Sequence, residues 1–225
     1  MIEDIHRNIP DNRGNSAYAS DPELARMLGI YMEPSLREHM TPVFEEMGTL
    51  VGDELETLAL EADKNPPVLH LRNRNGADAP RIEKHPSYRR LEHFAYSHFG
   101  LAAMSHRGGV FGWPDPLPPI AKYALTYLFV QAEFGLCCPL SMTDALTRTL
   151  RKFGEPELVA RYIDNLTSQD EAEHYQGAMF MTEQDAGSDV GAITTEARLE
   201  NGVWRLYGDK WFCSNPDAEL AMVLA

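Results

Sequence analysis

The spacing of hydrophobic residues divides the chain into a helical part and a strand-forming part. Over the first three quarters, apolar positions recur at the spacing that places them on one face of a helix. Over the last quarter, short apolar runs and alternating positions replace that spacing, as in half-buried strands. The pattern predicts an α+β chain, with antiparallel helices over residues 1–177 and strands over residues 178–225.

Capping residues, prolines and glycines predict where the helices begin and end. Ser20-Asp21-Pro22 predicts a helix start, because a capping side chain accepts from a free backbone N–H and proline fits the first turn. We expect a break near Gly48 and Gly52, and a buried central helix over residues 120–134, which are apolar nearly all round. Helices are predicted within residues 23–32, 35–63, 86–102, 120–134, 141–152 and 155–166.

Two segments of the helical part lack a regular period. Residues 1–20 are rich in Asn, Asp, Arg, Gly and Ser, and predict an irregular arm. Residues 65–85 begin with Asn65-Pro66-Pro67, where proline ends the preceding helix, and they contain an Asn-Gly pair and scattered charge. We therefore expect residues 65–85 to form a long ordered loop or a loosely structured crossing.

Four apolar segments predict strands in the last quarter. Residues 178–182 form one short run, and residues 194–199 and 203–207 alternate on either side of Asn-Gly, the strongest two-residue hairpin turn. Residues 221–225 are purely apolar and belong inside a sheet. Because two or three strands alone make a marginal sheet, we expect the second domain to be incomplete in this chain.

Composition and charge favour a globular protein and disfavour nucleic acid as a partner. The 225 residues are 44% hydrophobic and 24% charged, with a formal net charge of −14. An acidic surface repels phosphate backbones, so any contact with DNA would come from outside these residues. Six basic residues between Arg72 and Arg90 oppose this charge, and predict either a solvated loop and helix start or a weak anion-contacting patch.

Cysteine and histidine positions indicate a cytoplasmic protein without a metal site. Cys137, Cys138 and Cys213 form neither a disulfide framework nor a zinc motif, which fits a reducing cytosol. His93 and His98 face different sides of a helix and cannot chelate a metal together. The longest strongly apolar window is far shorter than the roughly 20 residues of a membrane span, so we expect no membrane partner.

Two segments of the strand-forming part could bind a ligand. Residues 179–189 leave a strand and enter a loop of small residues, where backbone N–H groups can approach an anion or a planar ring. Thr182 and Ser188 add hydroxyl groups there. Residues 210–215 place aromatic side chains beside a hydroxyl, which suits a stacked heterocycle. Taken singly, the first segment is explained equally well by an ordinary turn capped by Ser188 and Asp189, and most aromatic stripes like the second belong to a core.

The order and spacing of these segments resemble one family. Met181-Thr-Glu-x-x-Ala-Gly-Ser-Asp189, an Asn-Gly hairpin and Gly208-Asp-Lys-Trp-Phe-x-Ser-Asn215 resemble the β-domain of acyl-CoA dehydrogenases. Upstream segments resemble the branch linked to the adaptive response to DNA alkylation: Asn65-Pro-Pro-Val-Leu69, His85-Pro86 and Cys138-Pro-Leu-Ser-Met-Thr143. The resemblance implies an amino-terminal helical domain over residues 1–177 and the beginning of a β-barrel-like middle domain over residues 178–225.

The resemblance also implies an FAD site. Met181 and Thr182 would meet the pyrimidine edge of the flavin ring, and Gly187 and Ser188 would contact the pyrophosphate region or a nearby acyl-CoA. Met179 replaces a more usual aromatic residue, which bears on the specificity for the acyl chain.

Two further positions depart conservatively from the family pattern. Phe212 stands where many members have a tryptophan packed against the flavin ring, and Ser214 stands where they have a threonine near flavin N5. Phenylalanine still stacks and serine still donates a hydrogen bond, so a flavin site remains the expectation.

The resemblance implies α,β-dehydrogenation of an acyl-CoA thioester, with hydride transfer to flavin N5. The family's base is a glutamate in a carboxyl-terminal domain, so we expect no catalytic residue in this chain, and Glu183 of the flavin loop is not expected to replace it. A homotetramer is implied, whereas the electron acceptor and the acyl chain are not. The alternatives are a DNA-associated flavoprotein that protects against alkylation, with weak or vestigial dehydrogenase activity, and a cofactor-free helical interaction module.

Overall fold

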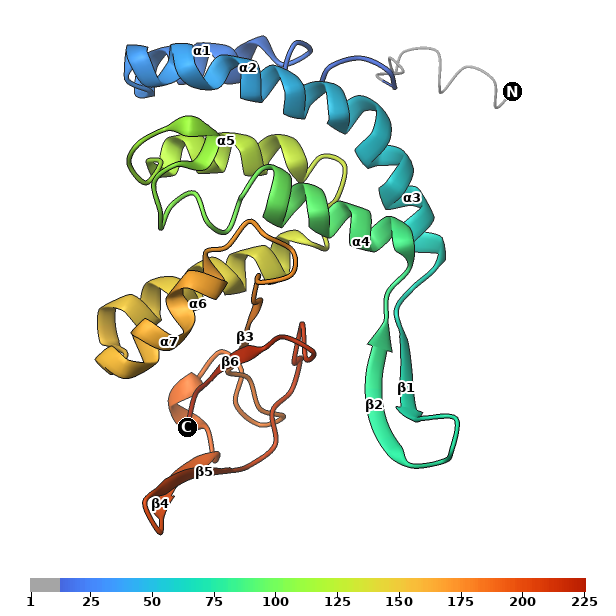
Figure 1. The fold of residues 1–225 in the computed structure, drawn as a ribbon, viewed down its shortest axis with the longest axis vertical. Helices are drawn as coiled ribbons and strands as arrows, with labels where there is room; N and C mark the ends of the chain where they lie inside the picture. Colours follow the sequence, from blue (N-terminus) through green and yellow to red (C-terminus); the bar gives the residue numbers. More distant parts are fainter. Residues whose placement is uncertain (1–12) are drawn as a thin grey trace.

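The computed structural model describes residues 13–225, so most of the predicted arm over residues 1–20 lies outside the described residues. Helices stack in successive layers, and the carboxyl-terminal strands lie at the end of this stack, below α6 (Cys137–Phe153) and α7 (Pro156–Leu166) (Figure 1). One β-hairpin projects beside the helices. This arrangement confirms the predicted α+β class, and all strands except those of the hairpin follow the last helix of the stack.

Apart from the first two strands, which were not predicted, the helices and strands follow the predicted order. The helical elements are α1 (Pro22–Tyr31), α2 (Pro34–Leu50), a π-helical segment (Val51–Leu55), α3 (Glu56–Lys64), α4 (Pro86–Glu92), a second π-helical segment (His93–His98), α5 (Pro119–Phe129), α6 (Cys137–Phe153) and α7 (Pro156–Leu166). The strands are β1 (Val68–Arg72), β2 (Asp78–Glu83), β3 (Gly177–Phe180), β4 (Glu196–Glu200), β5 (Val203–Tyr207) and β6 (Leu220–Val223).

The expected break near Gly48 and Gly52 is a π-helical segment that joins α2 to α3 without an interruption. The two glycines make room for the preceding chain. A Cβ atom at Gly52 would lie 1.9 Å from the Asn15 carbonyl oxygen, and one at Gly48 would lie 2.6 Å from Tyr18. The glycines therefore serve a close approach of two segments rather than a helix end.

Large apolar side chains from α2, α4 and α5 form the core. Among the fully buried side chains are Met40, Phe44, Leu91, Leu125 and Phe129. The prediction that residues 120–134 are buried all round is wrong in part, because α5 ends at Phe129 and the Tyr123 side chain is 62% exposed. Tyrosine carries a polar tip, which makes such a position compatible with a surface.

A buried charge cluster joins α5, α6 and the segment before Gly108. The Asp144 carboxylate lies 2.7 Å from His106 Nε2 and 2.7 Å from Lys122 Nζ. The three side chains are between 4% and 11% exposed. Burial raises the pKa of Asp144, but hydrogen bonds from His106 and Lys122 outweigh burial and lower that pKa to about 2. The cluster therefore favours the ionised carboxylate in the folded protein.

This lowered pKa predicts a loss of stability in acid. A carboxyl group with a lowered folded-state pKa contributes stability that is present above its unfolded pKa and is lost as the pH falls through its folded pKa. For Asp144 the window runs from 3.8 down to about 2. We expect a contribution of about 2 kcal/mol to be lost across it, at 1.36 kcal/mol per unit. Urea unfolding at several pH values measures how the free energy of unfolding changes with pH. The difference between the wild type and an Asp144→Asn variant gives the part that is due to this carboxyl group.

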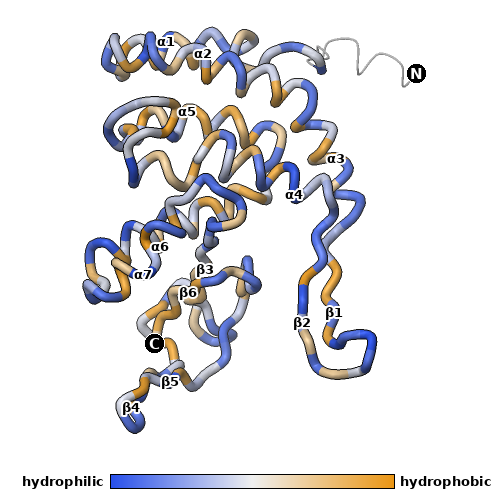
Figure 2. Tube along the Cα trace, in the orientation of Figure 1, coloured by the Kyte–Doolittle hydropathy of each residue, from blue (hydrophilic) through white to orange (hydrophobic). Residues whose placement is uncertain are grey.

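Residues 65–85 form a β-hairpin, so the prediction of a long loop is wrong. β1 and β2 pair antiparallel, with Val68 opposite Glu83 and Arg72 opposite Asp78. The turn between them contains the Asn-Gly pair, which favours a two-residue reversal, and Gly76 has φ +80°. Leu69 and Leu71 are exposed, and hydrophobic positions run along β1 in Figure 2.

The basic residues of this region are mostly paired with carboxylates. Arg72 contacts Asp78, Arg81 contacts Glu83, and Arg90 contacts Glu54 at 3.2 Å. These pairs support the solvated reading of the stretch, because each positive charge faces a nearby carboxylate.

The strand-forming part consists of short, separate sheets. β3 pairs with β6 in parallel, from Gly177 opposite Leu220 to Phe180 opposite Val223, and β4 pairs with β5 antiparallel. The Gly177 N–H donates to the Thr143 hydroxyl at 2.9 Å, which ties β3 to α6. Within residues 13–225 the strands form no closed barrel. No helix in this part of the chain is both long and apolar enough to cross a membrane.

Candidate functional site

The two predicted ligand-binding segments lie side by side. The Trp211 N–H donates to the Thr182 carbonyl at 2.8 Å, just beyond the end of β3. At the other end of the contact, Asn215 Nδ2 donates to the Gly177 carbonyl at 3.4 Å. The chain from Trp211 to Asn215 therefore runs antiparallel alongside β3. Phe212 and Ser214 are held next to the stretch that contains Met179 and Met181.

Lys210 fastens the two segments together. Its Nζ atom donates to the Met181 carbonyl at 3.0 Å and to Glu183 Oε1 at 2.8 Å. The Lys210 and Glu183 side chains are each only 7% exposed. Shielding from water strengthens a charge-assisted hydrogen bond, so this contact positions the loop after β3 more firmly than a surface pair would.

The Glu183 carboxylate accepts hydrogen bonds from two further residues. Thr194 and Thr195 each donate through the backbone N–H and the side-chain hydroxyl, at distances of 2.5 to 2.9 Å. Hydrogen bonds from Lys210, Thr195 and Thr194 hold the pKa of Glu183 well below its ordinary range. A carboxylate this strongly stabilised is a poor proton acceptor, which agrees with the expectation that Glu183 is not a catalytic base.

Exposed apolar side chains project from both segments. Phe212 is 79% exposed, Trp211 is 52% exposed and Met181 is 43% exposed. The Trp211 and Phe212 rings meet edge to face, with centroids 5.8 Å apart. Phe212 also has φ +56°, a left-handed conformation that is strained for a bulky residue. Strain and exposed aromatic surface at one residue are typical of a ligand-contacting position.

Three hydroxyl groups accompany this surface. Those of Thr182, Ser188 and Ser214 form no side-chain hydrogen bond within the described part of the chain, and Ser188 and Ser214 are exposed. Met179 lies within β3 opposite Met222 of β6 and is half-buried. The two segments that the sequence singled out therefore lie next to each other. The contacts at Met181 and Thr182 are made by Lys210 and Trp211, and Phe212 and Ser214 follow Trp211 within three residues.

Gly187 has no structural need to be glycine. A Cβ atom there would meet only the Thr182 methyl group, at an ordinary contact distance of 3.8 Å. By contrast, a Cβ atom at Gly208 would lie 2.3 Å from the Thr195 hydroxyl. The loop at Gly187 is open on its outer side, so a ligand can approach the backbone closely there.

Lys210 was missed as a site residue, although it lies inside the quoted motif. Its partners are 29 and 27 residues away in sequence, and only strand pairing brings them near. The sequence offered one signal for this contact. Lys210 is a single cation beside aromatic residues, and the other segment contains acidic residues that it could pair with. The histidines considered as metal ligands pair with carboxylates instead, His93 with Glu171 and His98 with Glu46. Residues 13–225 contain no group of side chains suited to a metal ion.

Two family models match the chain, and their matches meet where the helical part gives way to the last strands. Residues 8–172 match the family model "Adaptive response protein AidB N-terminal domain", and residues 178–225 match "Acyl-CoA dehydrogenase, middle domain".

Two curated relatives match over nearly the whole chain. The AidB protein of Escherichia coli (strain K12) is 30% identical over 233 residues, covering 98% of this chain and 41% of that protein. Acyl-CoA dehydrogenase family member 11 of Caenorhabditis elegans is 26% identical over 216 residues, covering 94% of this chain and 34% of that protein. The chain therefore spans only about a third to two fifths of the length of these relatives.

Two solved structures share the fold. Bd2924 in its apo form superposes with a TM-score of 0.81 at 27% identity, over 94% of this chain and 42% of that chain. Caenorhabditis elegans ACDH-11 in complex with C11-CoA superposes with a TM-score of 0.79 at 26% identity, over 92% of this chain and 35% of that chain.

Proposed function

The chain belongs to the AidB-type branch of the acyl-CoA dehydrogenase family, and we propose that it supplies the amino-terminal part of an FAD-dependent acyl-CoA dehydrogenase-like flavoprotein. In this proposal, residues 1–177 form the helical domain and residues 178–225 begin the middle domain. The observation that carries the proposal is the antiparallel contact between the Thr182 and Trp211 segments.

The side chains at this contact are chemically suited to FAD. Phe212 and Met181 offer apolar surface for the flavin ring, and Phe212 would stack against it. The Met181 backbone and the Thr182 hydroxyl would meet the polar pyrimidine edge, and the Ser214 hydroxyl would donate near N5. Apolar faces combined with a few placed hydroxyl groups are typical of cofactor sites.

Other residues would bind the remainder of the ligands. Ser188 and the open backbone at Gly187 would contact the pyrophosphate region or the acyl-CoA. Half-buried Met179 would shape the space for the acyl chain. The solved relative with C11-CoA supports an acyl-CoA thioester as the substrate class.

When bound, FAD would supply a hydride acceptor for α,β-dehydrogenation of the thioester. The chain's own residues would orient the ligands and donate hydrogen bonds to them. Hydroxyl groups whose positions are fixed before the reaction stabilise developing charge without reorganising. The proposal places proton abstraction on a glutamate outside these 225 residues, since Glu183 is held in its ionised form by Lys210. In this proposal, interaction with an electron acceptor and assembly into a tetramer are properties of the whole protein and not of these 225 residues alone.

A second candidate is suggested by the match to the adaptive response family. It is a DNA-associated flavoprotein that protects against alkylation, with weak or vestigial dehydrogenase activity. The formal net charge of −14 disfavours a DNA-binding surface within this chain, so this candidate assigns DNA contacts to the rest of the protein. Turnover of an acyl-CoA by the purified protein favours the first candidate, whereas salt-sensitive DNA binding without turnover favours the second.

Removing two hydroxyl groups should weaken FAD binding. We expect Thr182→Ala combined with Ser214→Ala to reduce FAD affinity by roughly tenfold to hundredfold, because each lost hydrogen bond is worth about 0.5–1.5 kcal/mol. The measurement is the flavin absorbance that remains after gel filtration, followed by titration with FAD. Thr57→Ala on α3 is the matched control, because that exposed hydroxyl donates only to the Asp53 carbonyl. A full-length wild-type protein that is colourless and gains no flavin on reconstitution would refute the proposal.

A further inference from the structure

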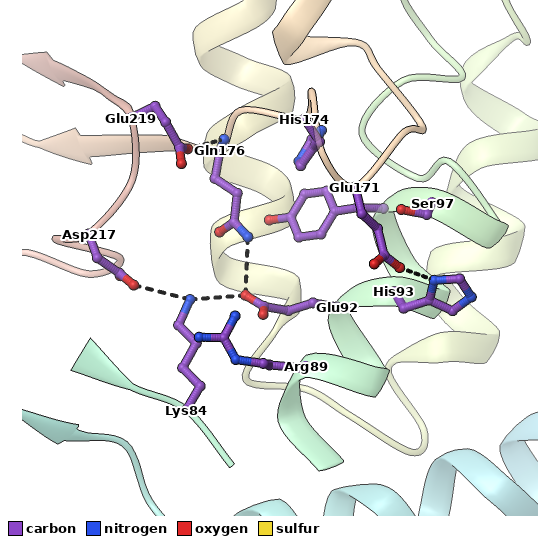
Figure 3. A pocket seen from close by; sticks show the side chains of 11 residues that line it. Lys84, Arg89, Glu92, His93, Ser97, Glu171, His174, Gln176, Asp217 and Glu219 are labelled. Carbon is purple, nitrogen blue, oxygen red and sulfur yellow. Dashed lines mark hydrogen bonds and ion pairs between the residues drawn. The ribbon is translucent and has the colours of Figure 1, made fainter. Parts of the chain in front are cut away.

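A chain of hydrogen-bonded polar side chains connects α4 with the segment that contains Ser214. Glu92 on α4 accepts from Lys84 Nζ at 3.0 Å and from Gln176 Nε2 at 3.1 Å, as Figure 3 shows. Gln176 in turn accepts from Asn215 Nδ2 at 3.0 Å through its Oε1 atom. The two partners of the Gln176 side chain lie 84 and 39 residues away in sequence, so only the fold brings them together.

The orientation of the two amide groups follows from their partners. The Gly177 carbonyl, 3.4 Å from Asn215 Nδ2, can only accept, so Asn215 turns its NH2 group to this side. Gln176 must then offer its oxygen to Asn215 and its NH2 group to the Glu92 carboxylate, which accepts. The bridge therefore needs a side chain at position 176 that accepts at one end and donates at the other.

The helical end of this bridge is shielded from water. The Lys84 and Glu92 side chains are 12% and 13% exposed. Lys84 Nζ also lies 3.3 Å from the carboxylate of Asp217, two residues beyond Asn215 in sequence. Because shielding strengthens charge-assisted hydrogen bonds, Glu92 and Lys84 form a fixed point to which the segment around Asn215 is tied twice.

Asn215 holds the turn in which Ser214 lies. Its φ of +56° is a left-handed conformation that asparagine adopts more readily than most residues. Its carbonyl accepts from the Ala218 N–H at 3.1 Å, and the Ser214 N–H donates to the Phe212 carbonyl at 2.9 Å. The side chain and the backbone of Asn215 are thus both held, which fixes the position from which the adjacent Ser214 hydroxyl extends.

We propose that Gln176 is a positioning residue for FAD, which holds Asn215, and with it the Ser214 hydroxyl, in place relative to Glu92 on α4. The inference rests on the proposed function, in which Ser214 donates near flavin N5, and adds to it an anchor in the helical part of the chain. A donor that is in place before the ligand arrives loses less conformational freedom on binding. Loss of the bridge should therefore weaken FAD binding only while the Ser214 hydroxyl is present.

A double-mutant cycle in the full-length protein tests this dependence, with affinity measured by titrating the flavin-free protein with FAD. Gln176→Met keeps an unbranched side chain of similar length but removes the amide, and we expect about fivefold weaker binding. In a Ser214→Ala background the same substitution should change the affinity by less than about twofold, because both changes remove the same hydrogen bond to FAD. A general loss of stability would instead weaken binding equally in both backgrounds.

An exchange of the two groups tests the hydrogen bond between positions 92 and 176. Gln176→Glu sets two carboxylates against each other and should weaken FAD binding at least as much as Gln176→Met does. Adding Glu92→Gln restores a donor and an acceptor between these positions, while Glu at position 176 still accepts from Asn215. We expect the exchanged pair to bind FAD within about twofold of the wild-type affinity.

Gln131→Met is the matched control and should leave the affinity unchanged, because the exposed Gln131 amide donates only to the Tyr127 carbonyl. Wild-type affinity in Gln176→Met, an equal loss with and without the Ser214 hydroxyl, or no recovery in the exchanged pair would each overturn the inference while the proposed function stands. A wild-type protein that binds no FAD would overturn both.

Discussion

Replacing Asp144 with alanine should lower the free energy of unfolding by about 3–5 kcal/mol. The substitution removes the carboxylate that contacts both His106 and Lys122 at 2.7 Å. Lys122 Nζ would remain in a site where its side chain is 10% exposed, with no comparable partner to compensate its charge. Urea unfolding followed by circular dichroism measures the loss.

A second variant separates charge from packing. In Asp144→Leu combined with Lys122→Met, apolar atoms replace both members of the pair, and such replacements are often neutral or stabilising. We expect the double variant to recover most of the lost stability. If Asp144→Ala lowers the free energy of unfolding by less than about 1 kcal/mol, the cluster contributes no more than a surface ion pair does, and the prediction is contradicted.

The helices were predictable because their signals are local. Asp21 caps α1 by accepting from the Leu24 N–H at 3.0 Å, next to the predicted proline. His85 precedes Pro86 and caps α4 in the same way, by accepting from the Ser87 N–H. Each signal lies within four residues of the helix end that it marks, so neither tertiary pairing nor burial is needed to recognise it.

The hairpin of β1 and β2 was missed because prolines and charge obscured its pattern. Val68 and Leu71 lie in an exposed strand, where both faces carry mixed residues and the alternation of a half-buried strand is absent. The Asn-Gly turn was the decisive local signal. Pairing across it, from Leu69 opposite Ile82 to Arg72 opposite Asp78, became visible only in the structure.

The two segments of the proposed flavin site stand out in the sequence as a motif, but the contacts that hold them together do not. The sequence places Thr182 and Ser214 in separate stretches, and the resemblance supplied the expectation that they meet. The contact depends on Lys210, which reaches back to Met181 and Glu183. Long-range pairing of this kind has no local signature, because its partners are chosen by the fold.

The same dependence makes Lys210 the most sensitive position of the proposed site. Glu183 is fixed by Thr194 and Thr195 on one side and by Lys210 on the other. Without the lysine, the carboxylate loses its positive partner and the Met181 carbonyl loses a donor. The loop would then be free to separate from the Trp211 segment, to which the Thr182 carbonyl still contributes a hydrogen bond.

Lys210→Met should therefore abolish retention of FAD, with a loss of affinity of about a hundredfold or more, as expected for removal of a charged partner from a buried pair. Flavin absorbance after gel filtration measures retention, and circular dichroism checks that the helical part stays folded. Lys152→Met is the matched control, since Lys152 is exposed at the end of α6 and contacts the Phe153 ring. Full retention of FAD by Lys210→Met would show that the two segments hold their positions without this lysine. Other contacts would then have to account for the proposed flavin site.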